Sequence, residues 1–312
     1  MSEARTVLPI DIVALVASGG RVYPNEARPW ERLGSPQTAP HPLETALEQW
    51  FSFATGKHAW ISVRGATIRG MISARRRAKR SVWEVDCLIV ADEDERVCLD
   101  LLARMSEGVT KAGAGRIFLR LPAESPIISQ ACETGFFAYG KNLLLRLERV
   151  PQLAEPNLEL RPSAPQDLFG RYQLYNRTTP ANVRFIEGMT LRDWQAAQEP
   201  WGGRPSEAVL EHDGTIIGEA RWLGNDDRSR IVLALDPAHA NRAPDLVAYA
   251  VRSLPVSGPV YCLVPAFAGH LISALQANGF APASEYVTLA RRTERLVEEA
   301  VPEQASSRIV VG

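Results

Sequence analysis

The feature that most constrains this chain is an internal repeat, because its two halves carry similar segments in the same order. Residues 60–73 and residues 208–221 both alternate apolar and polar positions around a tight turn, at Gly65-Ala66 and at Asp213-Gly214. Alternation broken by such a turn is typical of a β-hairpin. We therefore expect a duplicated unit in which both halves adopt the same fold.

A second pair of matching segments follows at nearly the same spacing. Ile117–Phe136 resembles Val260–Phe280, and both contain Pro-Ala early and Gly-Phe at the end. Each segment predicts a strand, a helix that begins near the proline, and a helix end at a glycine, Gly135 or Gly279.

Between these segments lies a shared strand followed by a helix. The strands are expected at Trp83–Val90 and Ile231–Asp236, and the helices at Arg96–Glu107 and Asp245–Ser253. Each half then ends in a further strand, at Asn142–Leu147 or Tyr286–Arg291. This order predicts an α+β fold with a mixed sheet in each half.

The length supports two domains, since domains usually run to about 100–200 residues and the chain has 312. The two prolines of Val150–Asn157 suit an extended linker. We expect an N-terminal domain at 1–149, a linker at 150–157, a C-terminal domain at 158–292 and a tail at 293–312.

The charge balance argues against nucleic acid as a general partner. Lys and Arg total 35 and Asp and Glu total 36, so the chain has no overall basic field. The run Ala74–Arg80 is the strongest basic segment. We expect it to be a solvated hairpin tip, and a patch for an acidic partner is the alternative.

Cysteine and histidine spacing predicts neither disulfides nor a metal site. The four cysteines form no CxxC pair and lie in apolar surroundings, which favours buried reduced thiols. The five histidines lack HxxH or HxxxH spacing. The start of the chain lacks the features of a signal peptide, and the apolar run Leu8–Val16 is too short to span a membrane. The expectation is a cytoplasmic protein with no metal and no membrane partner.

Leu160–Leu168, running into Leu174–Asn176, resembles the opening strand and first helix of the GCN5-related N-acetyltransferase (GNAT) family. The order of elements described above is similar to that fold in both halves, over roughly 5–147 and 158–292. The resemblance implies two tandem GNAT-like domains, each a mixed, mostly antiparallel sheet flanked by helices.

Members of the family bind acetyl-CoA in a notch where the fourth and fifth strands splay apart. Glycines and free N–H groups at the following helix N-terminus cradle the pyrophosphate there. The matching loop of the first half, Ala91–Arg96, has no glycine and four carboxylates, which suit a helix start but not a phosphate. The matching loop of the second half, Pro237–Asp245, also lacks glycine but offers His239 and Arg242.

The resemblance therefore implies that any acetyl-CoA site lies in the second half. The backbone of the strand end would face the pantetheine, and the loop would face the phosphates. The residues implied for the pantetheine are Leu233, Ala234, Leu235 and Asp236, and those implied for the phosphates are Ala240, Asn241 and Arg242.

The candidate base and the more favourable cofactor loop lie in different halves. Many family members use a tyrosine as the acid toward the CoA thiolate, and the aligned positions here are Ala131 and Leu275. A carboxylate on the fourth strand that accepts the amine proton would be Asp86 or Glu84, both in the first half.

Two functions follow from these observations. The first is an N-acetyltransferase that moves an acetyl group from acetyl-CoA to a small-molecule or peptide amine by direct attack. The alternative is a catalytically inactive GNAT-like protein that binds a different ligand or a protein partner through the old cleft. Binding of acetyl-CoA, and then turnover, distinguishes them.

Overall fold

The computed structural model describes residues 4–11, 24–34, 56–65, 67–78, 81–151, 155–224, 228–254 and 258–293. Its strands are β1 (Arg5–Thr6), β2 (Lys57–Arg64), β3 (Thr67–Arg76), β4 (Val82–Val90), β5 (Arg116–Pro122), β6 (Phe137–Leu147), β7 (Leu160–Pro162), β8 (Ser206–His212), β9 (Thr215–Gly224), β10 (Ser229–Leu235), β11 (Val260–Pro265) and β12 (Ala281–Arg292). Its α-helices are α4 (Glu95–Lys111), α5 (Ile127–Glu133), α6 (Leu168–Thr178), α7 (Ala181–Glu187), α8 (Leu191–Ala197), α9 (Ala243–Arg252) and α10 (Gly269–Ala277).

The repeat predicted from the sequence is confirmed in both halves. Strands β2 and β3 form one hairpin and β8 and β9 the other. Asp213 (φ 48°) and Gly214 (φ 71°) make the left-handed turn that a two-residue hairpin needs. The helices α5 and α10 both end before a left-handed glycine, Gly135 and Gly279.

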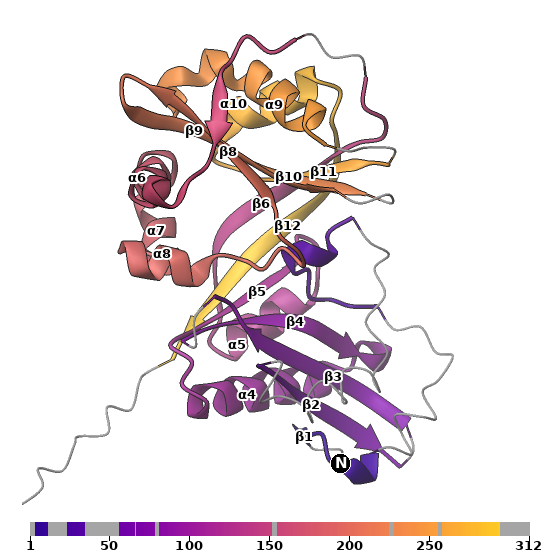
Figure 1. Cartoon of the computed structure of the whole chain (residues 1–312). Helices are drawn as coiled ribbons and strands as arrows, with labels where there is room; N and C mark the ends of the chain where they lie inside the picture. Colours follow the sequence, from indigo (N-terminus) through magenta and orange to yellow (C-terminus); the bar gives the residue numbers. More distant parts are fainter. Residues whose placement is uncertain are drawn as a thin grey trace, which may run out of the picture.

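The two halves exchange their last strands. The sheet order is β1-β2-β3-β4-β5-β12-β6-β11-β10-β9-β8-β7. Strand β6 of the first half pairs with β11 and β12, and β12 of the second half pairs with β5 and β6. Figure 1 shows these two long strands crossing between the lower and upper parts of the molecule. The mixed, mostly antiparallel α+β prediction is confirmed, and the sheets of the two halves form one sheet of 12 strands.

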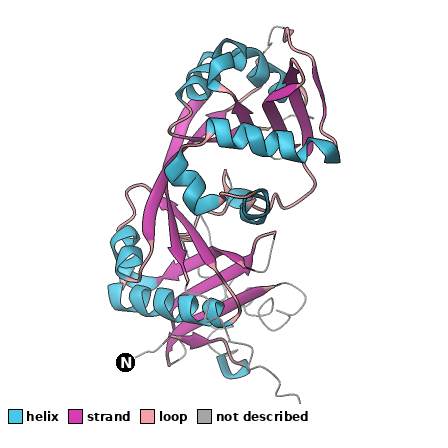
Figure 2. Ribbon diagram, turned by 90° about the vertical axis from the view of Figure 1, so that its left-hand side faces the viewer, coloured by secondary structure: helices cyan, strands magenta, loops and turns pink. Residues whose placement is uncertain are grey.

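Helices cover this sheet separately in each half (Figure 2). Helices α4 and α5 pack with β4, β5 and the end of β12 around Trp83, Leu101 and Met105. Helices α9 and α10 cover the face of β9 and β10 that carries Ile217. Helix α6 packs on the opposite face of those strands, beside Ile216, because successive residues of a strand point to opposite faces.

Two expectations about particular side chains are wrong. Arg75 and Arg77 belong to the basic run but do not sit at a solvated tip, because both form ion pairs with Glu84, whose side chain is only 4% exposed. Of the four cysteines, Cys132 is exposed, while the others are buried and all four are free thiols.

Within the described ranges, no helix is long and apolar enough to cross a membrane. The same ranges contain no group of three or more His, Cys, Asp or Glu side chains arranged to hold a metal ion. Residues 152–154 of the expected linker and 294–312 of the expected tail lie outside the described residues, so the domain boundary stays a prediction.

Candidate functional site

A notch opens in the second half where β10 and β11 part. The two strands pair in parallel only from Ser229 to Ile231 with Val260 to Cys262. Beyond that point a cavity of about 170 Å³ is lined by residues of both strands, of α6 and of the start of α10. Leu233, Ala234 and Leu235 line this cavity, and their role toward pantetheine stays a prediction.

The other predicted cofactor residues lie outside the lining of this cavity. The Asp236 carboxylate accepts hydrogen bonds from the Ala238 N–H at 3.0 Å and from Arg177 Nε at 2.7 Å. Burial opposes the charge of Asp236, but these two donors hold its pKa below the usual range. Ala240, Asn241 and Arg242 belong to the 3-10 turn that leads into α9. Their role toward phosphate stays a prediction.

A histidine lies across the edge of this notch. His270, near the start of α10, places Nε2 3.0 Å from the backbone oxygen of Leu235. That oxygen belongs to the strand end that would face a pantetheine arm. Leu275, aligned with the tyrosine that many GNAT enzymes use, is fully buried in the core beneath α10. It offers no proton to the notch.

The equivalent notch of the first half is filled by the chain itself. Strands β4 and β5 pair only from Val82 to Glu84 with Arg116 to Phe118. Beyond this point the segment Asn25–Arg28 lies between them. The Glu26 N–H donates to the Leu88 oxygen at 2.9 Å, and the Arg28 N–H donates to the Arg120 oxygen at 2.9 Å. A void of about 10 Å³ lies beside it, lined in part by Arg28, Glu84 and Arg120, which leaves room for one water molecule at most. Asn25, Ala27 and Arg28 also line a separate cavity of about 540 Å³.

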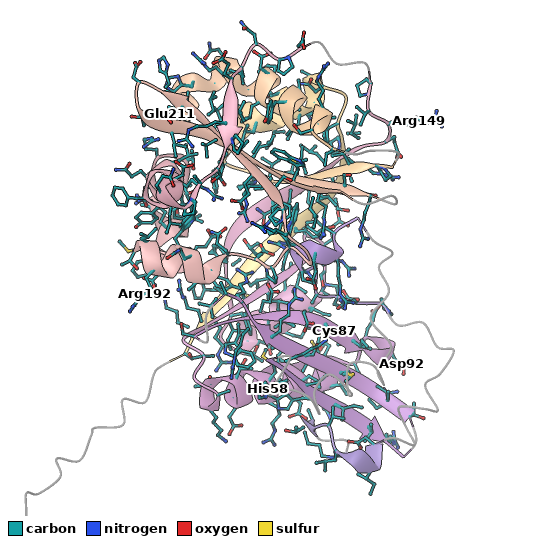
Figure 3. The ribbon with its side chains drawn as sticks, in the orientation of Figure 1. His58, Cys87, Asp92, Arg149, Arg192 and Glu211 are labelled. Atoms are coloured by element: carbon teal, nitrogen blue, oxygen red, sulfur yellow. The ribbon has the colours of Figure 1, made fainter. Side chains whose placement is uncertain are left out.

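Asn25 holds this segment in place. Its side-chain oxygen accepts from the N–H groups of Leu88 (2.9 Å) and Ala27 (3.1 Å), and its side-chain nitrogen donates to the Asp86 backbone oxygen (3.1 Å). The first helix after this notch is α4, and the Asp94 side chain caps its N-terminus. Asp92 lies near the end of the N-terminal strands (Figure 3). Among the described residues, the gap between β4 and β5 is therefore occupied by the chain, and the helix start beside it carries Asp92 and Asp94, both paired with Arg69.

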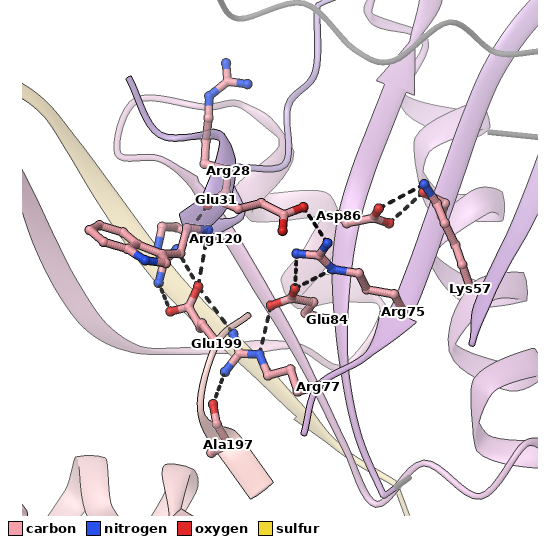
Figure 4. Close-up of polar contacts among 12 residues, drawn as sticks. Arg28, Glu31, Lys57, Arg75, Arg77, Glu84, Asp86, Arg120, Ala197 and Glu199 are labelled. Atoms are coloured by element: carbon pink, nitrogen blue, oxygen red, sulfur yellow. Dashed lines mark hydrogen bonds and ion pairs between the residues drawn. The ribbon is translucent and has the colours of Figure 1, made fainter. Parts of the chain in front are cut away.

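The two predicted catalytic carboxylates are both held in ion pairs. Glu84 lies between Arg75 and Arg77, and Asp86 faces Lys57 (Figure 4). Lys57 Nζ is 3.0 Å from Asp86, and the Ser73 hydroxyl donates to the same carboxylate at 2.7 Å. Burial alone would raise the pKa of Asp86, but Lys57 and Arg75 hold it below the usual range. A role as base stays a prediction for either residue, and these contacts favour a structural role.

A second cavity, of about 240 Å³, adjoins the open notch. Its walls come from both halves and from the exchanged strands: Tyr139 and Asn142 on β6, and Thr288 on β12. The two cavities share six lining residues, Trp194, Gln198, Arg221, Val232, Leu233 and Pro265. A molecule in this second cavity would therefore lie directly against the end of the notch.

The second cavity contains a carboxylate suited to accept a proton. Glu187, the last residue of α7, receives hydrogen bonds from the hydroxyls of Tyr139 (3.1 Å) and Tyr175 (3.4 Å). Burial raises the pKa of Glu187 above its ordinary value, despite these hydrogen bonds and the charge of Arg77. Glu187 could not be identified from the sequence, because its partners come from β6 and α6.

A buried charge network forms the opposite wall. Glu199 accepts two hydrogen bonds from Arg120 and one from the Trp30 N–H, and Arg77 lies 3.9 Å away. Burial works against the charge, but Arg120 and Arg77 lower the pKa of Glu199 to about 2. Because these residues come from both halves, the network fixes the halves against each other at the cavity.

Comparison with known proteins identifies the fold. No protein-family model and no curated protein sequence matches the chain. Among solved structures, a GCN5-related N-acetyltransferase from Sphaerobacter thermophilus matches 93% of this chain and 95% of its own, with a TM-score of 0.57 and 15% identity. A tandem GNAT protein from the clavulanic acid biosynthesis pathway matches 94% of this chain and 98% of its own, with a TM-score of 0.51 and 17% identity. The chain has the tandem GNAT fold that its sequence predicted.

Proposed function

We propose that this protein is an N-acetyltransferase with a single acetyl-CoA site, in the notch of the second half. The observation that carries the proposal is the open notch between β10 and β11, which ends at a cavity containing Glu187. The equivalent notch of the first half is filled by Asn25–Arg28. One chain would therefore bind one acetyl-CoA.

The neighbouring cavity would hold the acceptor amine. Glu187 is the proposed general base: it takes a proton from the ammonium group, directly or through a water molecule. The freed amine nitrogen then attacks the thioester carbonyl carbon. The new C–N bond forms, the C–S bond breaks, and the CoA thiolate leaves. The nitrogen then loses its second proton, which balances the proton that the thiolate takes up. A base with a raised pKa suits this step near neutral pH, because it can both accept and release the proton.

Tyr175 is the proposed source of the proton for the departing thiolate. It lines the notch beside Leu233–Leu235, and its hydroxyl also contacts Glu187. Burial and the nearby Glu187 carboxylate raise the pKa of Tyr175, so the phenol carries its proton at neutral pH. This residue would replace the tyrosine that is absent at Leu275.

Inactive binding through the old cleft is the second candidate. Two observations favour it: His270 contacts the Leu235 oxygen at the edge of the notch, and the loop before α9 has no glycine to approach a phosphate. In that case the cavity beside Glu187 would bind another ligand without turnover.

Thermal unfolding with and without millimolar acetyl-CoA tests the binding site. A ligand at about 100 times its Kd stabilises the folded state by roughly 2.7 kcal/mol, which gives a readable rise in Tm. We expect this rise in the wild type and its loss in Arg242→Ala, with Arg104→Ala on α4 as the matched control. No rise for the wild type would reject the proposal in favour of the second candidate.

Turnover tests the base. We expect Glu187→Gln to keep the rise in Tm with acetyl-CoA but to lower kcat by about 100-fold or more, the usual share of a general base. In the wild type, kcat should increase as the pH rises through the raised pKa of Glu187, since only the ionised carboxylate accepts a proton. A variant with an unchanged rate and pH profile would remove Glu187 from the mechanism.

A further inference from the structure

A third cavity, of about 540 Å³, has a lining distinct from both cavities described above. Tyr261 of β11 lines it, while Leu263, two residues further along the strand, lines the second cavity, so the two lie over the same face of the sheet. Leu144 on β6 and Ser284 on β12 also line it, so the exchanged strands form part of its wall. Its volume falls within the range of about 300–1,000 Å³ that is usual for small-molecule sites.

Four arginines line this cavity. Arg28 and Arg32 belong to the segment that leaves the first notch, Arg146 belongs to β6, and Arg228 directly precedes β10. All four are half-buried. Among the described lining residues none is acidic. The fold thus gathers four cations from distant parts of the chain around one cavity, which makes the cavity attractive to anions.

The charge balance of Arg28 differs from that of the buried network beside the second cavity. Burial opposes the charges of Arg77 and Arg120, but Glu199 raises the pKa of both. Burial lowers the pKa of Arg28, and the nearby Glu26 offsets this only in part. Figure 4 shows the Arg28 side chain pointing away from the network. An anion in the third cavity would supply the missing compensation.

Arg32 and Arg146 are the two arginines best placed to engage a ligand. Arg32 forms no ion pair with any described residue. Arg146 Nη2 lies 2.8 Å from Glu148, but the two side chains are 40% and 70% exposed. An ion pair so open to solvent is weak, so an anion can replace Glu148 at little cost.

The chemistry of the guanidinium group favours phosphate as this anion. The planar fork of an arginine donates two parallel hydrogen bonds to a phosphate or a carboxylate. A phosphate monoester carries a charge of about −1.5 to −2 at pH 7, against −1 for a carboxylate, and therefore gains more from several cations. Leu33 and Leu144 offer apolar contacts to the remainder of the molecule.

We propose that this cavity binds a small phosphorylated molecule, held by Arg32 and Arg146 within the positive field of Arg28 and Arg228. The proposal is independent of acetyl transfer. The 3-10 turn Trp30–Arg32 places Trp30 in the wall of the second cavity and Arg32 in the wall of the third. A ligand here would therefore contact the turn that also shapes the proposed acceptor site.

Calorimetric titration of the full chain tests the site, with phenyl phosphate as the probe and benzoate as its carboxylate counterpart at the same ionic strength. We expect phenyl phosphate to bind at least tenfold more tightly than benzoate. Absence of phenyl phosphate binding, or equal binding of the two probes, would overturn the proposal.

Substitutions place the bound probe. Arg32→Gln and Arg146→Gln should each weaken phenyl phosphate binding at least tenfold, and both should keep the rise in Tm with acetyl-CoA. The matched control is Arg192→Gln, at an exposed position of α8 outside the cavity. Because the Arg146 side chain is 40% exposed, its variant should fold even if Arg32→Gln does not.

Two outcomes would contradict this placement. If Arg242→Ala abolishes phenyl phosphate binding while both cavity variants retain it, the phosphate lies at the loop before α9 and the proposal fails. If Arg192→Gln weakens binding as much as the cavity variants do, the attraction is unspecific and the proposal fails as well. A failure of the proposed function would appear separately, as the absence of the acetyl-CoA shift in the wild type.

Discussion

Glu199→Gln tests the charge network that joins the two halves at the cavity. The folded chain lowers the pKa of Glu199 from an ordinary value of 4.5 to about 2. One pKa unit corresponds to 1.36 kcal/mol, so this ionised carboxylate stabilises the fold by about 3 kcal/mol at pH 7. Removing the charge of Glu199 also removes the ion-pair partner of Arg120 and a negative neighbour of Arg77. Breaking a buried ion pair typically costs about 3–5 kcal/mol. The two arguments agree on a loss of about 3 kcal/mol.

The pH dependence of the loss identifies its cause. Because the pKa of Glu199 is lowered on folding, its stabilisation is complete above about pH 4.5 and is lost as the pH falls toward 2. The difference in unfolding free energy between wild type and variant should shrink from about 3 kcal/mol at pH 7 to about 2 kcal/mol at pH 3.5.

Urea unfolding at the two pH values measures these differences. The control is Glu133→Gln on the exposed side of α5, which should change stability by less than about 0.5 kcal/mol. A cost below about 1 kcal/mol at pH 7, or a cost that is the same at both pH values, would refute the reasoning.

Two further predictions concern how the halves and the cavity are held. Fragments 1–149 and 158–312, expressed alone, should fail to give cooperative thermal unfolding and should recover it when mixed. The reason is that the part of the sheet in each half needs a strand from the other half. Two fragments that fold independently would contradict this. A Cβ at residue 188 would lie 2.3 Å from the backbone nitrogen of Trp194, so Gly188→Ala should displace α8 and lower both Tm and acceptor binding. Gly269→Ala, where a Cβ meets nothing within 4 Å, is the control, and equal effects of the two substitutions would show that the close approach does not matter.

The local elements could be read from the sequence because their signals are local. Alternating apolar residues around Asp213-Gly214 fixed one hairpin, and the glycines at Gly135 and Gly279 ended the two matching helices. The place of Leu233–Leu235 at the end of a central strand could be expected from the repeat, while their role toward a cofactor stays a prediction. The acidic loop before α4 predicts that the first half has no cofactor site, and this stays a prediction.

The composition of the candidate site could not be predicted in the same way. Glu187 becomes a candidate base only because Tyr139 and Tyr175 meet it from other elements. Trp30 lines the second cavity, of about 240 Å³, because Asn25 holds its segment between β4 and β5. Neither residue carries a spacing pattern, since the contacts that define its role lie far away along the chain.

The sequence alone determined a duplicated α+β unit with its hairpins and strand–helix units, because periodicity and turn chemistry act over a few residues. The tertiary structure decided which half each final strand completes. Strands β6 and β12 follow equivalent helices, α5 and α10. Backbone hydrogen bonds between strands do not depend on side-chain identity, so the local sequence pattern allows either strand to pair with β5 or with β11. Only the packing of the whole chain selects the exchange, and with it the cavity that both halves enclose.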